Sequence, residues 1–462
     1  MTFSRRHVLA GGATALAFSG LARNVLAQEE ATYRNEVPGY GPLVRDPLGV
    51  IDLPEGFQYR VLSQAGQTMD DGLLFPNSAD GMGCISLPGR FGGTSSRVAL
   101  ICNHELDKDD DAVTAFGAGH HRQGLIDPAK VYDRDDQGRV LGGGTTTLIY
   151  DMDERRVVSR HLSLAGTSTN CAGGVTPWGS WLTCEETTIK TGEGVGRDHG
   201  WVFEVPASER GLVTPVPLTA MGRFDHEAAC VDPMTGVVYL TEDEDDSLFY
   251  RFIPTTPGRL AEGGRLQALV IEGAPGADLR NWNGSTWSRG DWLDVRWIDL
   301  DEVESPNADL RLRGHAAGAA LFARGEGLTW GDQELYFTCT SGGPARFGQI
   351  VRLAVGRDGA ADRVQLFLES GDDRVYDYGD NLTVTPWGHL LVCEDRYSEE
   401  AIHLRGITPD GRAYAVARNA FEGNGEFAGA CVSPDGSTVF VNIQRPGITL
   451  AVTGPWSSLS GS

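Results

Sequence analysis

The chain is long, acidic and rich in turn-forming residues. It has 462 residues, with 63 acidic against 39 basic side chains and a formal net charge of -24. This charge argues against nucleic acids and anionic membrane surfaces as partners. No segment is apolar over the length needed to span a membrane, so we expect no membrane insertion. The 61 glycines and 22 prolines mark many turns and favour an all-β protein.

The first 27 residues have the pattern of a twin-arginine signal peptide. Arg5 and Arg6 precede a Gly/Ala-rich apolar stretch, and Val25-Leu26-Ala27 supplies small residues for cleavage. The alternative is a chance Arg-Arg pair in a disordered tail. Because this route carries folded proteins, it suits a protein that receives a cofactor before export. We therefore expect the twin-arginine export machinery to be a partner of the leader, and a periplasmic or extracellular mature protein of residues 28–462.

Six segments far apart in the chain share one outline of a turn, an apolar strand and a polar or acidic end. Strands repeated at this spacing favour a six-bladed β-propeller with long loop insertions and few short helices. We expect residues 28–462 to form this single catalytic domain, and a pair of β-sandwiches is the alternative fold. Acids at the strand ends of a propeller meet at its axis. The six segments are 97–105, 175–186, 228–243, 328–340, 384–395 and 430–444.

Two of these segments are close internal copies. The run Val-Thr-Pro-Trp-Gly begins at Val175 and again at Val384, and the copies end in Cys184-Glu185-Glu186 and Cys393-Glu394-Asp395. Only the first copy follows a glycine loop that contains a cysteine, Cys171. A thiolate among carboxylates favours a transition metal over calcium alone.

Most other cysteines lie inside short apolar runs, where cysteine behaves as a small buried hydrophobe. One or two disulfides remain an alternative for this group. Its members are Cys102, Cys184, Cys230, Cys339, Cys393 and Cys431.

Four tryptophans recur at intervals of five residues, which is neither a helix nor a strand period. Two interpretations stay open: packing at blade edges, or an aromatic wall that faces a substrate. The four are Trp282, Trp287, Trp292 and Trp297.

Together these motifs resemble those of the PhoX-type alkaline phosphatases, a family of exported bacterial propeller enzymes. The resemblance runs over nearly the whole mature chain. It implies a monomeric phosphomonoesterase that releases inorganic phosphate from small phosphomonoesters at an axial site of ferric iron and calcium. Besides the leader and the acidic strand ends, the motifs are Asn103-His104-Glu105, Asn170-Cys171-Ala172-Gly173-Gly174, His226-Glu227, Leu240-Thr241-Glu242-Asp243, Arg324-Gly325-Glu326-Gly327 and Asp380-Asn381-Leu382.

Residue by residue, the resemblance implies a metal site of two Fe3+ ions and two or three Ca2+ ions. Cys171 is then the thiolate that bridges the irons. Glu185 competes with Glu186, because strand alternation sends the two side chains to opposite sides. We leave His104 and His226 outside the site. The implied carboxylate ligands are Glu242 and Glu326 at the centre, with Glu105, Glu186, Asp380 and Glu394 around them.

Phosphomonoester hydrolysis explains why such a site needs cations and an arginine. The substrate is a dianion that carboxylates alone would repel, and ferric iron would both attract it and lower the pKa of bound water. We expect the planar Arg324 guanidinium to bind phosphate oxygens and stabilise the transition state, so Arg324 and Cys171 are the predicted catalytic residues. Arg396 is a second candidate for substrate binding.

Two other functions are weighed against this one. A calcium-dependent lactonase or esterase propeller would use the carboxylates but has no need of Cys171 or Arg324. A non-catalytic extracellular propeller that binds a partner would tolerate the loss of Cys171. Iron in the purified protein would favour the phosphatase over both.

Overall fold

Nearly all of the regular structure is β-sheet. The computed structural model describes residues 32–89, 94–110, 113–396, 401–423 and 425–459, so the predicted signal peptide lies outside the described residues. Within them there is one α-helix, α1 (Leu310–Ala316). No helix of this part of the chain is long and apolar enough to cross a membrane. Short 3-10 helices are η3 (Ala118–His120), η4 (Gln123–Leu125), η5 (Pro128–Lys130), η6 (Thr219–Met221), η7 (Leu260–Glu262) and η8 (Trp456–Leu459).

Three of the sheets are single antiparallel units of three or four strands. One contains β4 (Ala79–Pro88), β5 (Thr94–His104), β6 (Gly143–Asp151) and β7 (Arg156–Thr167). The next contains β8 (Asn170–Val175), β9 (Ser180–Glu185) and β10 (Val202–Pro206). The third contains β24 (Phe427–Val432), β25 (Thr438–Ile443), β26 (Ile448–Thr453) and β3 (Gln58–Gln64).

The other two sheets are larger. The six-stranded sheet is built from β20 (Gly379–Val384), β21 (Leu390–Glu394), β22 (His403–Ile407), β23 (Ala413–Asn419), β2 (Ile51–Pro54) and β1 (Leu43–Val44). The nine-stranded sheet runs through β11 (His226–Val231), β12 (Val238–Glu242), β13 (Tyr250–Pro254), β14 (Gly264–Ile271), β15 (Trp292–Asp299), β19 (Asp362–Glu369), β18 (Gln349–Ala354), β17 (Glu334–Cys339) and β16 (Gly325–Trp330).

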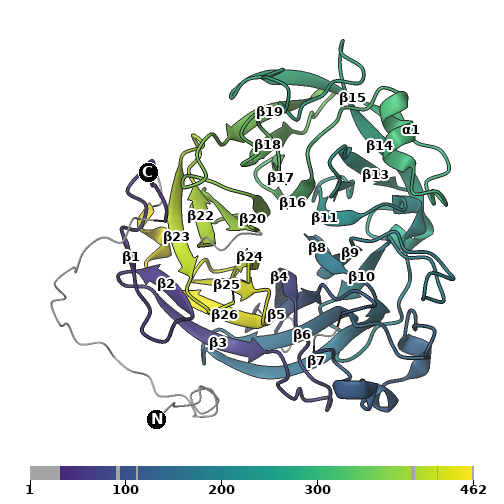
Figure 1. Cartoon of the computed structure of the whole chain (residues 1–462), viewed down its shortest axis with the longest axis vertical. Coiled ribbons are helices and arrows are strands. Elements are labelled where there is room, and N and C mark those ends of the chain that lie inside the picture. Colours follow the sequence, from purple (N-terminus) through teal and green to yellow (C-terminus); the bar gives the residue numbers. More distant parts are fainter. Residues whose placement is uncertain (1–31, 90–93, 111–112, 397–400, 424, 460–462) are drawn as a thin grey trace. The chain divides into compact units, whose positions relative to one another are not determined.

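Strands from the two ends of residues 33–462 close the arrangement. β3, near the start of this unit, pairs antiparallel with β26, near its end, in a register that places Val61 opposite Leu450. β2 likewise pairs with β23. These pairings join segments almost four hundred residues apart, which is how a chain of successive sheets is closed around an axis (Figure 1).

The predicted all-β, propeller-like arrangement with few helices is confirmed. The prediction of six separate blades is not matched by the hydrogen bonding, which joins the strands into five sheets. The difference comes from β15, which pairs with β14 on one side and with β19 on the other and so fuses two runs of four strands.

Six innermost strands surround the axis: β4, β8, β11, β16, β20 and β24 (Figure 1). Neighbouring strands in this ring approach closely because glycine stands at the contacts. A Cβ atom at Gly327 in β16 would lie 2.5 Å from the carbonyl oxygen of Asp380 in β20. At Gly174 in β8 it would overlap the Ala229 carbonyl of β11. Larger residues there would push the strands apart and widen the site described below.

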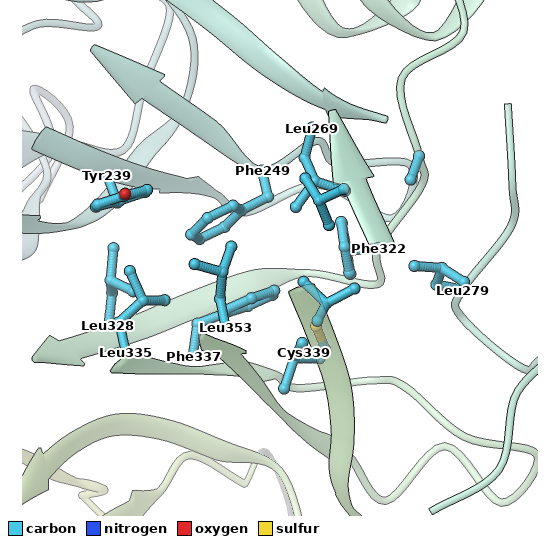
Figure 2. Packing of buried hydrophobic residues seen from close by; sticks show 14 of the residues in the cluster. Tyr239, Phe249, Leu269, Leu279, Phe322, Leu328, Leu335, Phe337, Cys339 and Leu353 are labelled. Atoms are coloured by element: carbon cyan, nitrogen blue, oxygen red, sulfur yellow. The ribbon is translucent and has the colours of Figure 1, made fainter. Parts of the chain in front are cut away.

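Many strands are buried along their whole length, such as β12, β21 and β25, whereas β3 and β15 are partly exposed. Figure 2 shows the apolar contact between the two halves of the nine-stranded sheet, where the Phe249 and Phe337 rings stack 4.3 Å apart. Cys339 packs in the same cluster. All eight cysteines are free in the structure, and the six predicted buried ones are buried.

Candidate metal centre and active site

A β-bulge interrupts each innermost strand at the same end of the strand. The pairing with the second strand shifts between Ala79 and Met82 in β4, for example, and between Asn170 and Gly173 in β8. Bulges turn side chains out of the sheet and are common beside active sites. In five of the six strands the residue at the bulge carries a metal-binding group: Asp80, Cys171, Glu227, Glu326 and Asp380.

Each innermost strand pairs with the next strand along the chain, here called the second strand. A second set of side chains comes from the residue directly after each of these second strands. Each of these residues donates its backbone N–H to a carbonyl just before the innermost strand; the Glu186 N–H, for instance, lies 2.8 Å from the Thr169 oxygen. The same bond recurs six times at 2.8–3.1 Å. The donors are Glu105, Glu186, Asp243, Thr340, Asp395 and Gln444. Four of these six residues are acids.

Four of the six acceptors of these bonds have an unusual backbone. Ser78, Thr169, Arg324 and Tyr378 all have φ between 47° and 51°, the left-handed region that non-glycine residues seldom enter. Such strain persists only where the surrounding structure enforces it, and it concentrates at functional sites. Four repeats of it around the axis mark this end of the molecule as the functional one.

The two sets of side chains meet in three groups. Within each group, the possible ligand atoms all lie within 4.8 Å of one another. Glu227 belongs to two groups and so links them. The third group includes Glu426, which lies just before β24. The groups are Cys171 with Glu186 and Glu227, Glu227 with Glu326 and Asp380, and Asp80 with Glu105 and Glu426.

Burial and mutual repulsion raise the pKa values of these acids when no cation is bound. Burial, and then the neighbouring Asp380 carboxylate, raises the pKa of Glu227 well above its usual range. Burial raises the pKa of Glu105 to about 7, and it raises the pKa of the Cys171 thiol as well. The same causes act on Asp80, Glu186, Glu326, Asp380 and Glu426.

The donor set fits bound metal ions. Glu227 is fully buried. Among the described residues, no backbone or side-chain N–H donates a hydrogen bond to its carboxylate oxygens. The Cys171 thiol is the only donor next to this carboxylate in the described part of the chain. One oxygen of buried Asp80 is likewise without a donor. Buried carboxylates in this state are costly unless they hold a cation. A single thiolate among carboxylates suits a transition metal, and the all-carboxylate groups suit a hard cation such as calcium.

Five of the seven sequence-predicted ligands lie in these groups, and two lie elsewhere. Glu242 accepts hydrogen bonds from the Tyr250 hydroxyl at 2.7 Å and the Leu248 N–H at 3.2 Å. Glu394 forms a buried ion pair with Arg405 at 2.6 Å, which holds the pKa of the carboxyl below its usual range. Both carboxylates brace the strands behind the site. The five that come together are Cys171, Glu105, Glu186, Glu326 and Asp380.

Strand alternation explains the two displaced residues. Glu242 and Glu394 are the last residues of β12 and β21, and Glu185 is the last residue of β9, where it binds His199 at 2.6 Å. In each case the next residue, Asp243, Asp395 or Glu186, is the one whose N–H binds the carbonyl before the innermost strand. We call the six positions that make this bond the ring positions. Of the open pair Glu185 and Glu186, the structure therefore places Glu186 in a ligand group.

Sequence reasoning did not select five further acids at the axis. A signal for two of them was present: the internal repeat aligns Asp395 with Glu186, and the same register applied to Thr241-Glu242-Asp243 points to Asp243. Glu227 stands in a recognised motif, whereas nothing local marks the remaining two. The five are Asp80, Glu227, Asp243, Asp395 and Glu426.

The two predicted arginines differ in position. Arg324 lies within the cluster, where its Nη2 is 2.9 Å from Asp243 and 2.7 Å from Glu326. Arg396 follows the ring residue Asp395 and pairs with Asp377 at 2.7 Å. Both side chains are about one-fifth exposed, so each is partly accessible to a ligand at this face.

A cavity of about 390 Å³ opens beside the cluster. Glu105 and Glu186 of the ligand groups line it, and Lys108 and Arg445 line it in ion pairs with Asp109 and Asp110. The ligand groups are thus reachable from outside the protein on this side.

The metal-free protein is expected to become less stable as pH rises from about 5 to about 8. Between the ordinary pKa of 4.5 and the folded-state value of about 7, Glu105 holds a proton in the folded state that the unfolded chain has released. This one group contributes a loss on the order of 2 kcal/mol. Urea unfolding after chelation would measure it. Added calcium should reverse the trend because it binds the deprotonated carboxylates, and Glu105→Gln should flatten it; a chelated protein that gains stability with pH would contradict this account.

Comparisons with known proteins identify the family. Residues 38–447 match a sequence model described as alkaline phosphatase PhoX. No curated protein matches the sequence significantly. Among solved structures, Pseudomonas fluorescens PhoX in complex with vanadate, a transition state analogue, is 19% identical, with a TM-score of 0.66 over 88% of this chain and 96% of that one.

Weaker likenesses connect the chain to other enzymes. A gluconolactonase of Xanthomonas campestris is 13% identical, with a TM-score of 0.35 over 82% of this chain and 97% of that one. A luciferin-regenerating enzyme is 9% identical, with a TM-score of 0.42 over 87% and 96%. Neither likeness bears on function, whereas the family match spans most of the chain. The chain belongs to the PhoX alkaline phosphatase family, and it is a phosphatase.

Proposed function

We propose that the axial cluster is the centre at which this phosphatase hydrolyses phosphomonoesters, and that iron and calcium occupy it. The observation that carries the proposal is the convergence of one thiol and the carboxylates into three ligand groups, two of which share Glu227. P. fluorescens PhoX binds vanadate, a transition state analogue. A site of the same kind here would act on small-molecule phosphomonoesters.

The donor types suggest how the metals divide. Cys171, Glu186 and Glu227 would hold ferric iron, and Glu326 with Asp380 would complete a second iron position through the shared Glu227. The all-carboxylate group of Asp80, Glu105 and Glu426 would hold calcium. We propose two Fe3+ ions and two or three Ca2+ ions. When bound, they would neutralise the carboxylates, attract the phosphate dianion and lower the pKa of bound water.

The chain's own residues would bind and orient the phosphate. Arg324 presents a guanidinium at the edge of the cluster, and Asp243 holds it through both Nε and Nη2 at 2.9 Å. This bidentate pairing fixes the guanidinium plane at the edge of the cluster, where its positive charge would stabilise the charge that develops on phosphate oxygens in the transition state. Cys171 would take part as a metal-bound thiolate, and Arg396 would contact substrate at a second position.

The remaining proposals concern the whole protein. We propose that the nine-stranded sheet represents two blades fused by β15, which gives six blades around the axis. We further propose that residues 1–27 direct twin-arginine export, that residues 28–462 act as a monomer, and that the mature enzyme works in the periplasm or outside the cell.

The decisive experiment is elemental analysis of protein exported by its own host, paired with a chromogenic phosphomonoester assay. We expect iron and calcium together with turnover that chelation of calcium abolishes and added calcium restores. Turnover without iron would refute the thiolate–iron centre. Calcium without phosphatase turnover would refute the assignment of this chemistry to the cluster.

A further inference from the structure

The ring of acids around the axis has two gaps, at Thr340 after β17 and at Gln444 after β25. The ring position after β17 is Thr340, a neutral residue, whereas the equivalent positions after β12 and β21 are Asp243 and Asp395. Thr340 still makes the ring contact, because its N–H lies 3.0 Å from the Arg324 oxygen. Its hydroxyl donates to the Gly379 carbonyl at 2.8 Å, next to Asp380. At the Thr340 gap an anionic substrate meets less repulsion than at Asp243 or Asp395.

The loop 341–347 leaves from the gap and is anchored to the ring at both ends. It begins directly after Thr340. At its other end the Phe347 carbonyl accepts a hydrogen bond of 3.0 Å from Tyr378, whose own carbonyl binds the N–H of Asp395. The exposed tip residue Arg346 is therefore held at the rim of the site, with φ at 59°.

Trp282 positions the Arg346 side chain. The guanidinium carbon of Arg346 lies 4.0 Å from the centre of the Trp282 ring, and that of Arg280 lies 4.4 Å from it. The indole N–H donates to the Ser341 carbonyl at 2.7 Å. Stacking and this hydrogen bond fix both groups before any ligand arrives.

Of the two arginines that stack on Trp282, Arg280 is neutralised by a carboxylate and Arg346 is not. Arg280 makes two hydrogen bonds to the Asp278 carboxylate, at 2.8 and 2.7 Å. Arg346 forms no ion pair with any residue that the structure describes. A stacked, exposed and uncompensated guanidinium at the rim of an active site is suited to bidentate recognition of a carboxylate or phosphate.

We propose that Arg346, positioned by Trp282, recognises an anionic group in the leaving part of the substrate. The inference rests on the proposed function of the cluster and names a preferred substrate class: phosphomonoesters that carry a carboxylate or a second phosphate. Of the four evenly spaced tryptophans, Trp282 thus takes the substrate-facing role. Trp287 is buried, and Trp292 and Trp297 lie on β15.

The test compares three substrates of similar length on the metal-loaded enzyme: glycerol phosphate, phosphoglycerate and propanediol bisphosphate. Their distal groups are a hydroxyl, a carboxylate and a phosphate. In Arg346→Ala, kcat/KM for the anionic substrates relative to glycerol phosphate should fall about tenfold. Arg346→Lys should restore part of the loss. A fall for one anionic substrate alone would identify which anion is recognised.

The control is Arg265→Ala, which removes an exposed arginine paired with Asp299 on another part of the molecule. It should leave the ratio unchanged, which separates local recognition from net charge. An unchanged ratio in Arg346→Ala would overturn the inference while glycerol phosphate turnover still supports the phosphatase centre. If no substrate is turned over, calorimetric binding of phosphoglycerate against glycerol phosphate decides: equal affinities in wild type and variant overturn it.

Discussion

Cys171→Ser is expected to remove iron from the protein and to lower phosphatase activity at least about 100-fold. The hydroxyl is nearly the same size as the thiol but is a much poorer ligand for ferric iron. Cys171 lies at the bulge of β8 within 4.8 Å of ligand atoms of Glu186 and Glu227, so no other described thiol replaces it in that group. Iron analysis, visible absorption and a phosphomonoester assay on protein exported by its own host would measure the effect.

The matched control is Cys339→Ala. Cys339 is also fully buried, but it packs among apolar side chains in the nine-stranded sheet (Figure 2). Its loss should lower the free energy of unfolding by about 1 kcal/mol and leave the iron content intact. Full activity and full iron content in Cys171→Ser would refute the proposed thiolate ligand.

Glu227→Gln is expected to abolish activity and, in the metal-free protein, to raise the free energy of unfolding by about 1–3 kcal/mol. Glu227 belongs to two ligand groups, so its neutral amide weakens both. Without metal, burial and the neighbouring Asp380 disfavour the ionised form of the same carboxylate and raise its pKa, and this costs folding free energy. Denaturant unfolding with and without calcium and iron would show opposite signs for the two states.

Glu242→Gln provides the comparison. Glu242 is equally buried, but Tyr250 and Leu248 donate to it and it lies outside the ligand groups. This variant should be destabilised in both states and should keep its metals. If Glu227→Gln destabilised the metal-free protein as Glu242→Gln does, Glu227 would be a structural acid and the linked centre would lose its bridge.

Much of the fold was predictable because strand formation is local. Apolar runs such as 335–339 in β17 are bounded by turns, and a repeat of such runs without amphipathic helices leads to sheets around an axis. The number of separate sheets was not predictable, because it depends on β15. That strand is an ordinary alternating segment whose two partners lie in different repeats.

Some residues of the proposed metal centre were likewise predictable from the sequence, and others were not. Cys171 could be found because a cysteine in a glycine loop beside an internal repeat is visible along the chain, and Glu105 stands in a recognisable motif. The choice between adjacent acids could not be made reliably, since Glu242 and Asp243 differ by one position and point to opposite sides of the strand. Only the pairing register and the bulge settle which one faces the axis.

The sequence by itself determined the strand content, the family, and the cysteine from which a metal site could be inferred, because these depend on residues close together in the chain. Tertiary structure alone decided which acids come together at the axis. Asp80 and Glu426 are far apart in sequence and meet because β3 pairs with β26 and brings β24 beside β4. Ring closure, together with the alternation of side chains along each strand, selects which of many acids share the axis.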